Sequence, residues 1–325
     1  MQDSQSLQGS TDQLIIVRFT SGLGNQMFQY NLYSMLKNRY PDVPVKADVT
    51  WFYTDNEHHG FELRRIFEGV EGSDFSLEEA TASEIYSVSG QIPTLVKGPL
   101  AKPLKFLLGL VNRKLREAGK CEKAGITFDH LKKKVTFDEL RDLDPARNYY
   151  IFGFFIEEAY YRDRIDILKK ELVFPPMEGE NAALADEMQN VESVSVHVRR
   201  GDYLSATYAG QFLCLGRDYY EVAVNIINTH MSNPRFYIFS EDADFVRSEF
   251  SWLPNKTVVD QNSGNDSFRD MQLMSKCKAN IIANSTFSQW ASILNVNPEH
   301  ITVYPARYMA DEDTEVRTLP GWIRV

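Results

Sequence analysis

Short apolar runs alternate with amphipathic segments along most of the chain. The run LIIVRF (14–19) predicts a buried strand and ends in a small-residue turn, after which Phe28, Leu32 and Leu36 recur at helical spacing. A strand, a glycine-containing turn and a helix together open an α/β layer. The pattern of the first half also predicts strands at 43–48 and 149–156, and a helix that reaches residue 172.

The second half repeats strand and helix at regular spacing, which favours a mostly parallel sheet with right-handed crossovers. The segment VFPPMEGEN (173–181) is the best linker candidate. We therefore predict an α/β chain with a disordered tail at 1–13 and two domains at 14–176 and 177–325. The strands of the second half are predicted at 194–198, 235–240, 257–260, 280–284 and 301–305, and the helices at 181–190, 218–231, 242–250, 268–277 and from 285 onward.

Composition narrows the class of protein. The 325 residues are 43% hydrophobic and 25% charged, which is typical of globular proteins and excludes a low-complexity chain. The net charge of −10 argues against a general nucleic-acid coat, which needs a positive field. Cys121, Cys214 and Cys277 lack metal-ligand spacing and favour a reducing compartment. No apolar run approaches the roughly 18–20 residues of a membrane span and no signal peptide pattern is present, so we expect a cytoplasmic protein.

One segment departs from the acidic balance. Residues 97–134 contain eleven Lys or Arg and three acids, a local charge of +8. Within it, residues 102–120 form a basic amphipathic stretch that can lie on an anionic membrane, such as the inner face of the bacterial membrane. A docked helix with a solvated basic face is the alternative, and it is slightly favoured.

Polar side chains follow the predicted strand at 194–198. His197 and Arg199 lie on one face of this strand, about 6.6 Å apart, and Arg200 and Asp202 fall in the turn that follows. Two adjacent guanidinium groups suit a phosphate, because each offers paired donors in a fixed geometry. A surface Arg–Asp pair is the simpler alternative. The phosphate interpretation is favoured only because two further strand ends agree with it.

The next strand ends in Ser240, Glu241 and Asp242. A carboxylate at this place can accept hydrogen bonds from ribose hydroxyls, whereas Ser240 can simply cap the next helix. The spacing of Asp242 and Asp244 resembles a metal-binding pair, but arginines and a helix dipole can replace a metal, and we expect none. Asp270 could contact the edge of a base, although a solvated helix acid is the safer interpretation for this residue alone.

The strand at 280–284 leads directly into a helix. Asn284, Ser285, Thr286 and Ser288 surround the helix start, where free N–H groups and the positive end of the helix dipole favour an anion. A plain serine or threonine cap is the alternative. Three hydroxyl residues and an asparagine exceed what a cap requires.

The glycine turn SGLGNQMF (21–28) matches the first part of the dinucleotide pattern G-x-G-x-x-G and has Met27 at its third glycine. Asp48, at the end of a predicted strand, keeps a dinucleotide-dependent oxidoreductase open as an alternative. Asn25 and Gln26 begin the helix, and they could hydrogen-bond a sugar or a phosphate from the cleft between the domains. A capping role for Asn25 is the simpler interpretation.

Four motifs together carry a family resemblance. GLGNQMFQY, HVRRGDY, FSEDADF and ANSTFSQWASIL, with further support from GFELRRIF (60–67), resemble glycosyltransferase family 11, the α-1,2-fucosyltransferases. The resemblance implies a GT-B architecture, in which two Rossmann-like domains face each other across a cleft. It implies inverting transfer of fucose from GDP-β-L-fucose, bound by the second domain, to the 2-hydroxyl of a terminal β-galactose, without a metal or other cofactor. The acceptor glycan stays open and could be lipid-linked, and a non-catalytic nucleotide- or glycan-binding protein is a further alternative.

The resemblance also suggests roles for the residues identified above. Arg199 would stabilise the leaving GDP, Asn25 would contact phosphate or fucose, and Asp202 is the nearest carboxylate for a general base, if one is needed. The residues expected to bind the donor are His197, Arg200, Ser240, Asp242, Asp270, Asn284, Ser285, Thr286 and Ser288.

Overall fold

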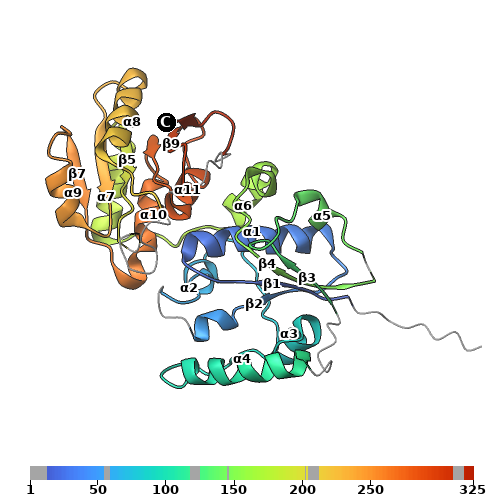
Figure 1. The fold of residues 1–325 in the computed structure, drawn as a ribbon. Helices are drawn as coiled ribbons and strands as arrows, with labels where there is room; N and C mark the ends of the chain where they lie inside the picture. The colour runs from blue at the N-terminus through green and yellow to red at the C-terminus, as the bar shows by residue number, and fades with distance from the viewer. Residues whose placement is uncertain are drawn as a thin grey trace, which may run out of the picture. The chain divides into compact units, whose positions relative to one another are not determined.

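The computed structural model describes residues 13–54, 59–117, 125–144, 146–201, 203, 212–309 and 318–325. Their contacts divide them into two compact units (Figure 1). The first unit takes its residues from 1–21, 28–61 and 77–155, and the second from 22–27, 62–76 and 156–325. Residues 1–12 of the predicted tail lie outside the described residues. The contacts place 156–176 in the second unit, and the predicted assignment of acceptor and donor to domains split at 176 stays a prediction.

The first unit is built on a four-stranded parallel sheet. Its strand order is β2-β1-β4-β3, so the order reverses between β1 and β4. The predicted strands at 14–19, 43–48 and 149–156 are confirmed, whereas β3, a partly buried strand of five residues, was not predicted. The strands are β1 (Ile15–Arg18), β2 (Val45–Asp48), β3 (Gly125–Asp129) and β4 (Asn148–Phe152).

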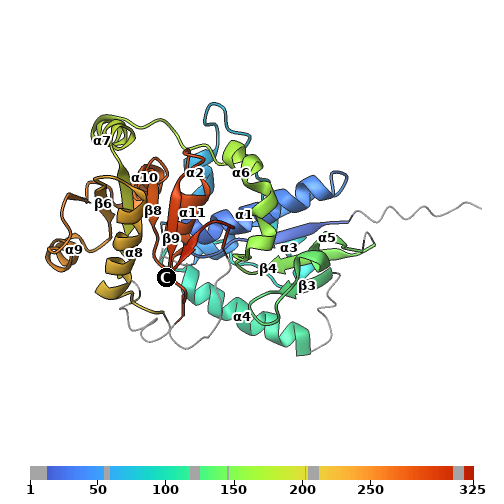
Figure 2. The same ribbon diagram turned by 90° about the horizontal axis from the view of Figure 1, so that it is seen from above.

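Helices cover both faces of this sheet. Helix α1 lies on one face and α3 and α4 lie on the other, with α4 on the outside of the unit (Figures 1 and 2). The amphipathic stretch predicted at 102–120 corresponds to α4. The helices are α1 (Leu23–Arg39), whose first residues belong to the second unit, α3 (Ala82–Ser89), α4 (Ala101–Glu117) and the short α5 (Phe137–Arg141).

The second unit contains a six-stranded parallel sheet with the order β10-β9-β8-β5-β6-β7. All five strands predicted in this half are present. The strands are β5 (Ser193–His197), β6 (Arg235–Phe239), β7 (Lys256–Val259), β8 (Ala279–Ile281), β9 (Ile301–Tyr304) and β10 (Ile323–Arg324). The helices are α2 (Leu63–Phe67), α6 (Ile165–Glu171), α7 (Gly179–Asn190), α8 (Arg217–His230), α9 (Ala243–Glu249), α10 (Phe268–Met274) and α11 (Thr286–Ile293).

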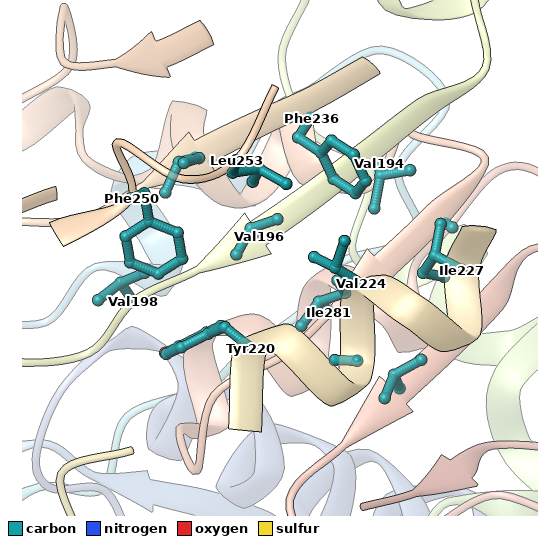
Figure 3. Packing of buried hydrophobic residues seen from close by; sticks show 14 of the residues in the cluster. Val194, Val196, Val198, Tyr220, Val224, Ile227, Phe236, Phe250, Leu253 and Ile281 are labelled. Atoms are coloured by element: carbon teal, nitrogen blue, oxygen red, sulfur yellow. The ribbon is translucent and has the colours of Figure 1, made fainter. Parts of the chain in front are cut away.

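The two faces of β5 differ in polarity. Val194, Val196 and Val198 pack against side chains of α8, among them Val224 and Ile227 (Figure 3). The opposite face is polar and buried: Asn280 Nδ2 donates a hydrogen bond of 2.6 Å to Ser195 Oγ. Because side chains alternate along a strand, His197 lies on the same face as Ser195.

The α/β class with two parallel sheets, as the predicted GT-B type has, is confirmed. The expectation that the two units face each other across a cleft stays a prediction. No helix in the described part of the chain has the length and apolar character needed to cross a membrane.

Candidate functional site

The candidate site lies where the strand order of the second sheet reverses. From β5 the chain builds β6 and β7 on one side and then returns to place β8 on the other. Open α/β sheets bind ligands beyond the carboxyl ends of the strands at such a reversal. A hydrogen bond of 2.6 Å from the Tyr203 hydroxyl to the Asn284 carbonyl joins the segments that follow β5 and β8. Residues predicted from separate motifs are thus brought to one edge of the sheet.

Arg199 is held by a residue that the sequence analysis did not select. Its guanidinium forms an ion pair with the Glu241 carboxylate, which follows β6. The Gly201 N–H donates a hydrogen bond of 3.2 Å to the other carboxylate oxygen of Glu241. A Cβ atom at Gly201 would lie 2.5 Å from that oxygen, so only a glycine at this position leaves room for the Glu241 carboxylate. The signal for Glu241 was its position between Ser240 and Asp242 at a strand end.

Arg200 forms a second pair with the same segment. Its Nε lies 3.3 Å from Asp242 Oδ2, and its guanidinium carbon lies 3.8 Å from the centre of the Phe245 ring. Asp242 also caps α9, because its Oδ1 accepts a hydrogen bond of 3.1 Å from the Phe245 N–H. Ser240 Oγ accepts one of 3.2 Å from the Asp242 N–H. These contacts fix the segment after β6 beside both arginines.

The spacing of Asp242 and Asp244 is explained by local contacts. Asp244 pairs with Arg247 at 3.1 Å, and its side chain is 99% exposed. Within the described ranges, no group of three or more His, Cys, Asp or Glu side chains could hold a metal ion.

Several buried polar atoms at this edge, Arg200 Nε among them, have no hydrogen-bond partner among the described residues. Two of them are His197 Nδ1 and Asn284 Oδ1. Burial, reinforced by the charge of Arg199, lowers the pKa of His197 to about 3, so its ring is neutral. The Asn284 amide is fixed by hydrogen bonds of 2.7 and 2.8 Å to the carbonyls of Leu213 and Tyr308. Buried polar atoms in folded proteins almost always have partners, so both atoms are suited to contact a ligand.

The start of α11 combines a serine cap with the positive end of the helix dipole at partly exposed Thr286. Ser285 Oγ accepts a hydrogen bond of 3.3 Å from the Phe287 N–H. Ser288 Oγ accepts one of 3.2 Å from the Ala283 N–H and donates one of 3.3 Å to the Ser285 carbonyl. The two serines therefore shape the turn, and half-buried Thr286 is the hydroxyl nearest the helix end. A helix N-terminus of this kind attracts negative charge.

A second helix start meets the first one. Gly24, in the first turn of α1, lies so close to α11 that a Cβ atom would be 2.6 Å from the Thr286 carbonyl carbon and 2.7 Å from the Phe287 nitrogen. The positive ends of two helix dipoles consequently converge. Asn25 is partly exposed there, whereas Gln26 is fully buried. The expectation that Gln26 faces a ligand is wrong, because its Oε1 accepts a hydrogen bond of 2.9 Å from the Glu62 N–H.

Glu62 is a further residue that sequence reasoning did not select. Its side chain is 3% exposed, and its carboxylate accepts hydrogen bonds from Arg65 Nη2 at 2.9 Å and from the Leu23 N–H at the start of α1. Burial raises the pKa of Glu62 to about 7, although the charge of Arg65 opposes this. The available signal was an acid inside the apolar motif GFELRRIF.

The remaining predicted residues are less closely tied to this edge. Asp270, in the first turn of α10, accepts a hydrogen bond of 2.8 Å from Asn262 Nδ2, and burial raises its pKa to about 7. Its contact with a base stays a prediction. Asp202 lies outside the described residues, so its role as a base also stays a prediction.

The dinucleotide alternative is not supported by the two residues on which it was based. The backbone of Thr286 and Phe287 occupies the space next to Gly24 where a pyrophosphate would approach the second glycine. The Asp48 carboxylate is already occupied, since it accepts hydrogen bonds from the Tyr150 hydroxyl at 2.5 Å and from the N–H and hydroxyl of Thr50 at 2.9 and 2.6 Å.

Comparisons with known proteins agree with the motifs. The family model described as glycosyl transferase family 11 matches residues 127–325, more than half of the chain. Two proteins of Escherichia coli are similar over nearly their whole length. The O-antigen biosynthesis glycosyltransferase WbnK is 29% identical, and the match covers 94% of this chain and 98% of that protein. An alpha-1,2-colitosyltransferase is 26% identical, and the match covers 92% of this chain and 94% of that protein. A solved structure of the fucosyltransferase NodZ from Bradyrhizobium is similar with a TM-score of 0.47 and 14% identity, covering 87% of this chain and 93% of that one. This chain belongs to glycosyl transferase family 11, the α-1,2-fucosyltransferase family.

Proposed function

We propose that this glycosyltransferase moves L-fucose from GDP-β-L-fucose to the 2-hydroxyl of a terminal β-galactose, with inversion at the fucose anomeric carbon. Membership of family 11 and the similarity to an alpha-1,2-colitosyltransferase support the class of reaction and the linkage. The observation that carries the proposal is the place of Arg199 at the reversal of strand order, after a strand that ends in His197, whose buried Nδ1 lacks a partner among the described residues.

The chemical task is to stabilise GDP as it leaves. Negative charge grows on the β-phosphate while the fucose ring becomes oxocarbenium-like, so a donor already fixed in place lowers the barrier. In this proposal Arg199 supplies that donor, because Glu241, whose carboxylate accepts the Gly201 N–H, holds it at the strand end. Arg200 and the positive end of α11 at Thr286 assist. Removing one such donor typically costs on the order of 10²–10³ in rate.

Uncharged and acidic side chains of the second unit would bind the nucleoside part of the donor. Neutral His197 and the Asn284 amide would contact guanine or ribose through their unpartnered atoms. Asp242 and Ser240 would accept or donate hydrogen bonds at the ribose, and Asp270 would pair with the guanine edge. Asn25, beside the meeting point of two helix starts, would contact phosphate or fucose.

The acceptor hydroxyl must lose a proton during transfer. Asp202 is the proposed base, with the alternative that it orients Arg200 and that transfer is dissociative enough to need no strong base. The pH profile of Asp202→Asn decides between these roles: retained activity with an unchanged acidic limb would rule out the base.

We also propose that the protein contacts an anionic membrane through the outer face of α4. Phe106 and Leu107 on this face are 69% and 56% exposed. From Lys97 to Lys114 the chain carries five basic residues and no acidic one, in a protein of net charge −10. Exposed bulky apolar groups among cations suit an anionic lipid surface. This contact would bring the enzyme to lipid-linked acceptors.

An assay of GDP-fucose with a panel of β-galactosides, followed by linkage analysis of the product, tests the function directly. An α-1,2-linked fucose on galactose is the expected product. Binding of GDP without transfer or donor hydrolysis would indicate a non-catalytic binding protein. Stabilisation by NAD(P) and not by GDP in a thermal-shift comparison would overturn the proposal.

A further inference from the structure

A pocket of 190 Å³ lies at the carboxyl edge of the sheet in the first unit. Arg18 and Asp48, the last residues of β1 and β2, are paired in register and both line it, together with Tyr150 of β4. The strand order of this sheet reverses between β1 and β4. The pocket therefore occupies the same kind of position in the first sheet that the candidate donor site occupies in the second.

Arg18 brings an unsatisfied donor to this pocket. Its Nε is buried and has no hydrogen-bond partner in the parts of the chain that the structure describes. The guanidinium carbon lies 5.0 Å from the centre of the Phe152 ring, so the group is placed by an aromatic contact and not by an acid. A buried arginine nitrogen without an acceptor is costly, and an oxygen of a bound molecule would satisfy it.

The carboxylate in the pocket is already fixed. Asp48 accepts hydrogen bonds from Thr50 and from the Tyr150 hydroxyl, so it does not pair with Arg18. Burial and the charge of Asp48 raise the pKa of Tyr150 well above its usual value, so the phenol stays protonated and keeps donating. Arg18 Nε is therefore left for a ligand, and Asp48 is already held by its own hydrogen bonds before a ligand arrives.

The size and lining of the pocket limit what fits. A volume of 190 Å³ far exceeds the roughly 10–15 Å³ that one water molecule needs, so the pocket has room for a small ligand such as one six-membered sugar ring. Trp51 offers an aromatic surface, while Gln91 and Lys105 add polar groups at exposed positions. An aromatic side chain with a few fixed polar groups is a combination that orients a polyhydroxylated ring.

We propose that this pocket binds one pyranose residue of the acceptor glycan, with Arg18 donating hydrogen bonds to its oxygen atoms and Trp51 contacting its apolar face. The inference rests on the proposed glycosyl transfer and names the acceptor subsite in that reaction. Arg18 and Trp51 thereby act on the acceptor and not on the nucleotide.

Two substitutions test the pocket, with lactose as the acceptor and GDP-fucose as the donor. Arg18→Gln and Trp51→Ala are each expected to raise the KM for lactose about tenfold or more, because a hydrogen bond from a charged group or a ring contact is lost. The KM for GDP-fucose should change by less than about twofold. Arg39→Gln is the matched control, since Arg39 is an exposed arginine in the same unit that pairs with Asp142.

Gln91→Ala and Lys105→Ala keep the test decisive if the first two variants fail to fold, because both side chains are exposed. Each is expected to raise the KM for lactose severalfold, and an unchanged value in every folded variant would overturn the pocket while leaving the proposed function intact. Absence of GDP-fucose binding and hydrolysis in the wild-type protein would instead overturn the proposed function. Saturation-transfer NMR would then test lactose binding to the pocket without any reaction. Loss of lactose binding in Arg18→Gln supports the pocket, and lactose binding that persists in this variant refutes it.

Discussion

Glu241 holds Arg199 by an ion pair while its second carboxylate oxygen accepts the Gly201 N–H. The guanidinium is therefore oriented before any ligand is bound, by groups that follow two neighbouring strands. Such support of a functional side chain by a second residue is what gives a site its geometric accuracy. It also explains why the segment from Arg199 to Gly201 and the segment after β6 have to be considered together.

The role of Arg199 predicts a large loss of activity upon its substitution. Arg199→Ala is expected to lower kcat on the order of 10²–10³, because a preorganised charged donor to the leaving diphosphate is removed. Arg199→Lys keeps the charge but loses the paired donors, and it should stay well below the wild-type rate. Steady-state kinetics with GDP-fucose provide the measurement. Arg217→Ala, at an exposed pair with Glu221, serves as the control, and near-full activity of Arg199→Lys would contradict the assigned role.

The contact between Gly24 and α11 predicts an effect on stability. Gly24→Ala would force its methyl group against the backbone of Thr286 and Phe287, which cannot move as a flexible side chain could. We expect destabilisation of about 1–3 kcal/mol, as for other overpacked sites. Gly109→Ala is the matched control: it lies in α4 with no atom within 4 Å of the new methyl group, and alanine favours the helix by roughly 0.5–1 kcal/mol. Thermal unfolding that gives both variants the same midpoint would show that the close approach is absent.

The buried carboxyl of Glu62 predicts a pH dependence of stability. Its pKa is raised from 4.5 to about 7 in the folded protein, so between these values the folded state binds more protons than the unfolded state. The free energy of unfolding should therefore fall by about 3 kcal/mol as the pH rises through this range. Glu62→Gln keeps an oxygen for the Leu23 N–H and should make this dependence less steep, while buried Asp270, whose pKa is also raised to about 7, keeps its own contribution.

Denaturant unfolding at pH 5, 6, 7 and 8 measures the effect of Glu62. Glu68→Gln, a change at an exposed carboxylate paired with Arg64, should leave the pH dependence as in the wild type. Parallel pH profiles for the wild type and Glu62→Gln would refute the raised pKa.

The outer face of α4 predicts binding to anionic vesicles. Wild-type protein should co-sediment with vesicles that contain phosphatidylglycerol and not with phosphatidylcholine alone, and added salt should weaken the association. The double variant Phe106→Ser, Leu107→Ser should lose most of the binding, since the two most exposed large apolar side chains of α4 are removed. Ile167→Ser and Val222→Ser, at sites 40% and 47% exposed on α6 and α8, form the control. Equal sedimentation with both lipids, or none with either, would refute the membrane contact.

Much of the secondary structure follows from local pattern. The runs at 194–198 and 235–240 are apolar, rich in β-branched or aromatic residues and bounded by polar segments, and they form β5 and β6. β3 was not predicted because GITFD is short and only partly buried, so no clear alternation marks it. Gln26 was misjudged because its position at a helix start is visible in the sequence, whereas its hydrogen bond to the Glu62 N–H joins residues 36 positions apart.

The amino-acid sequence by itself determined the α/β class, the positions of most strands, and the identity of the arginines and hydroxyl residues that end them, because strand periodicity and strand-end polarity are local properties. Only the tertiary structure decided that Glu241 holds Arg199, that Glu62 is buried beside the start of α1, and that Arg18 opens onto a pocket with Asp48. These relationships depend on the order in which parallel strands lie side by side and on which side chains packing removes from water. Strand order and burial cannot be predicted from any short stretch of the chain, since both arise from segments that are distant in sequence and meet only in the folded protein.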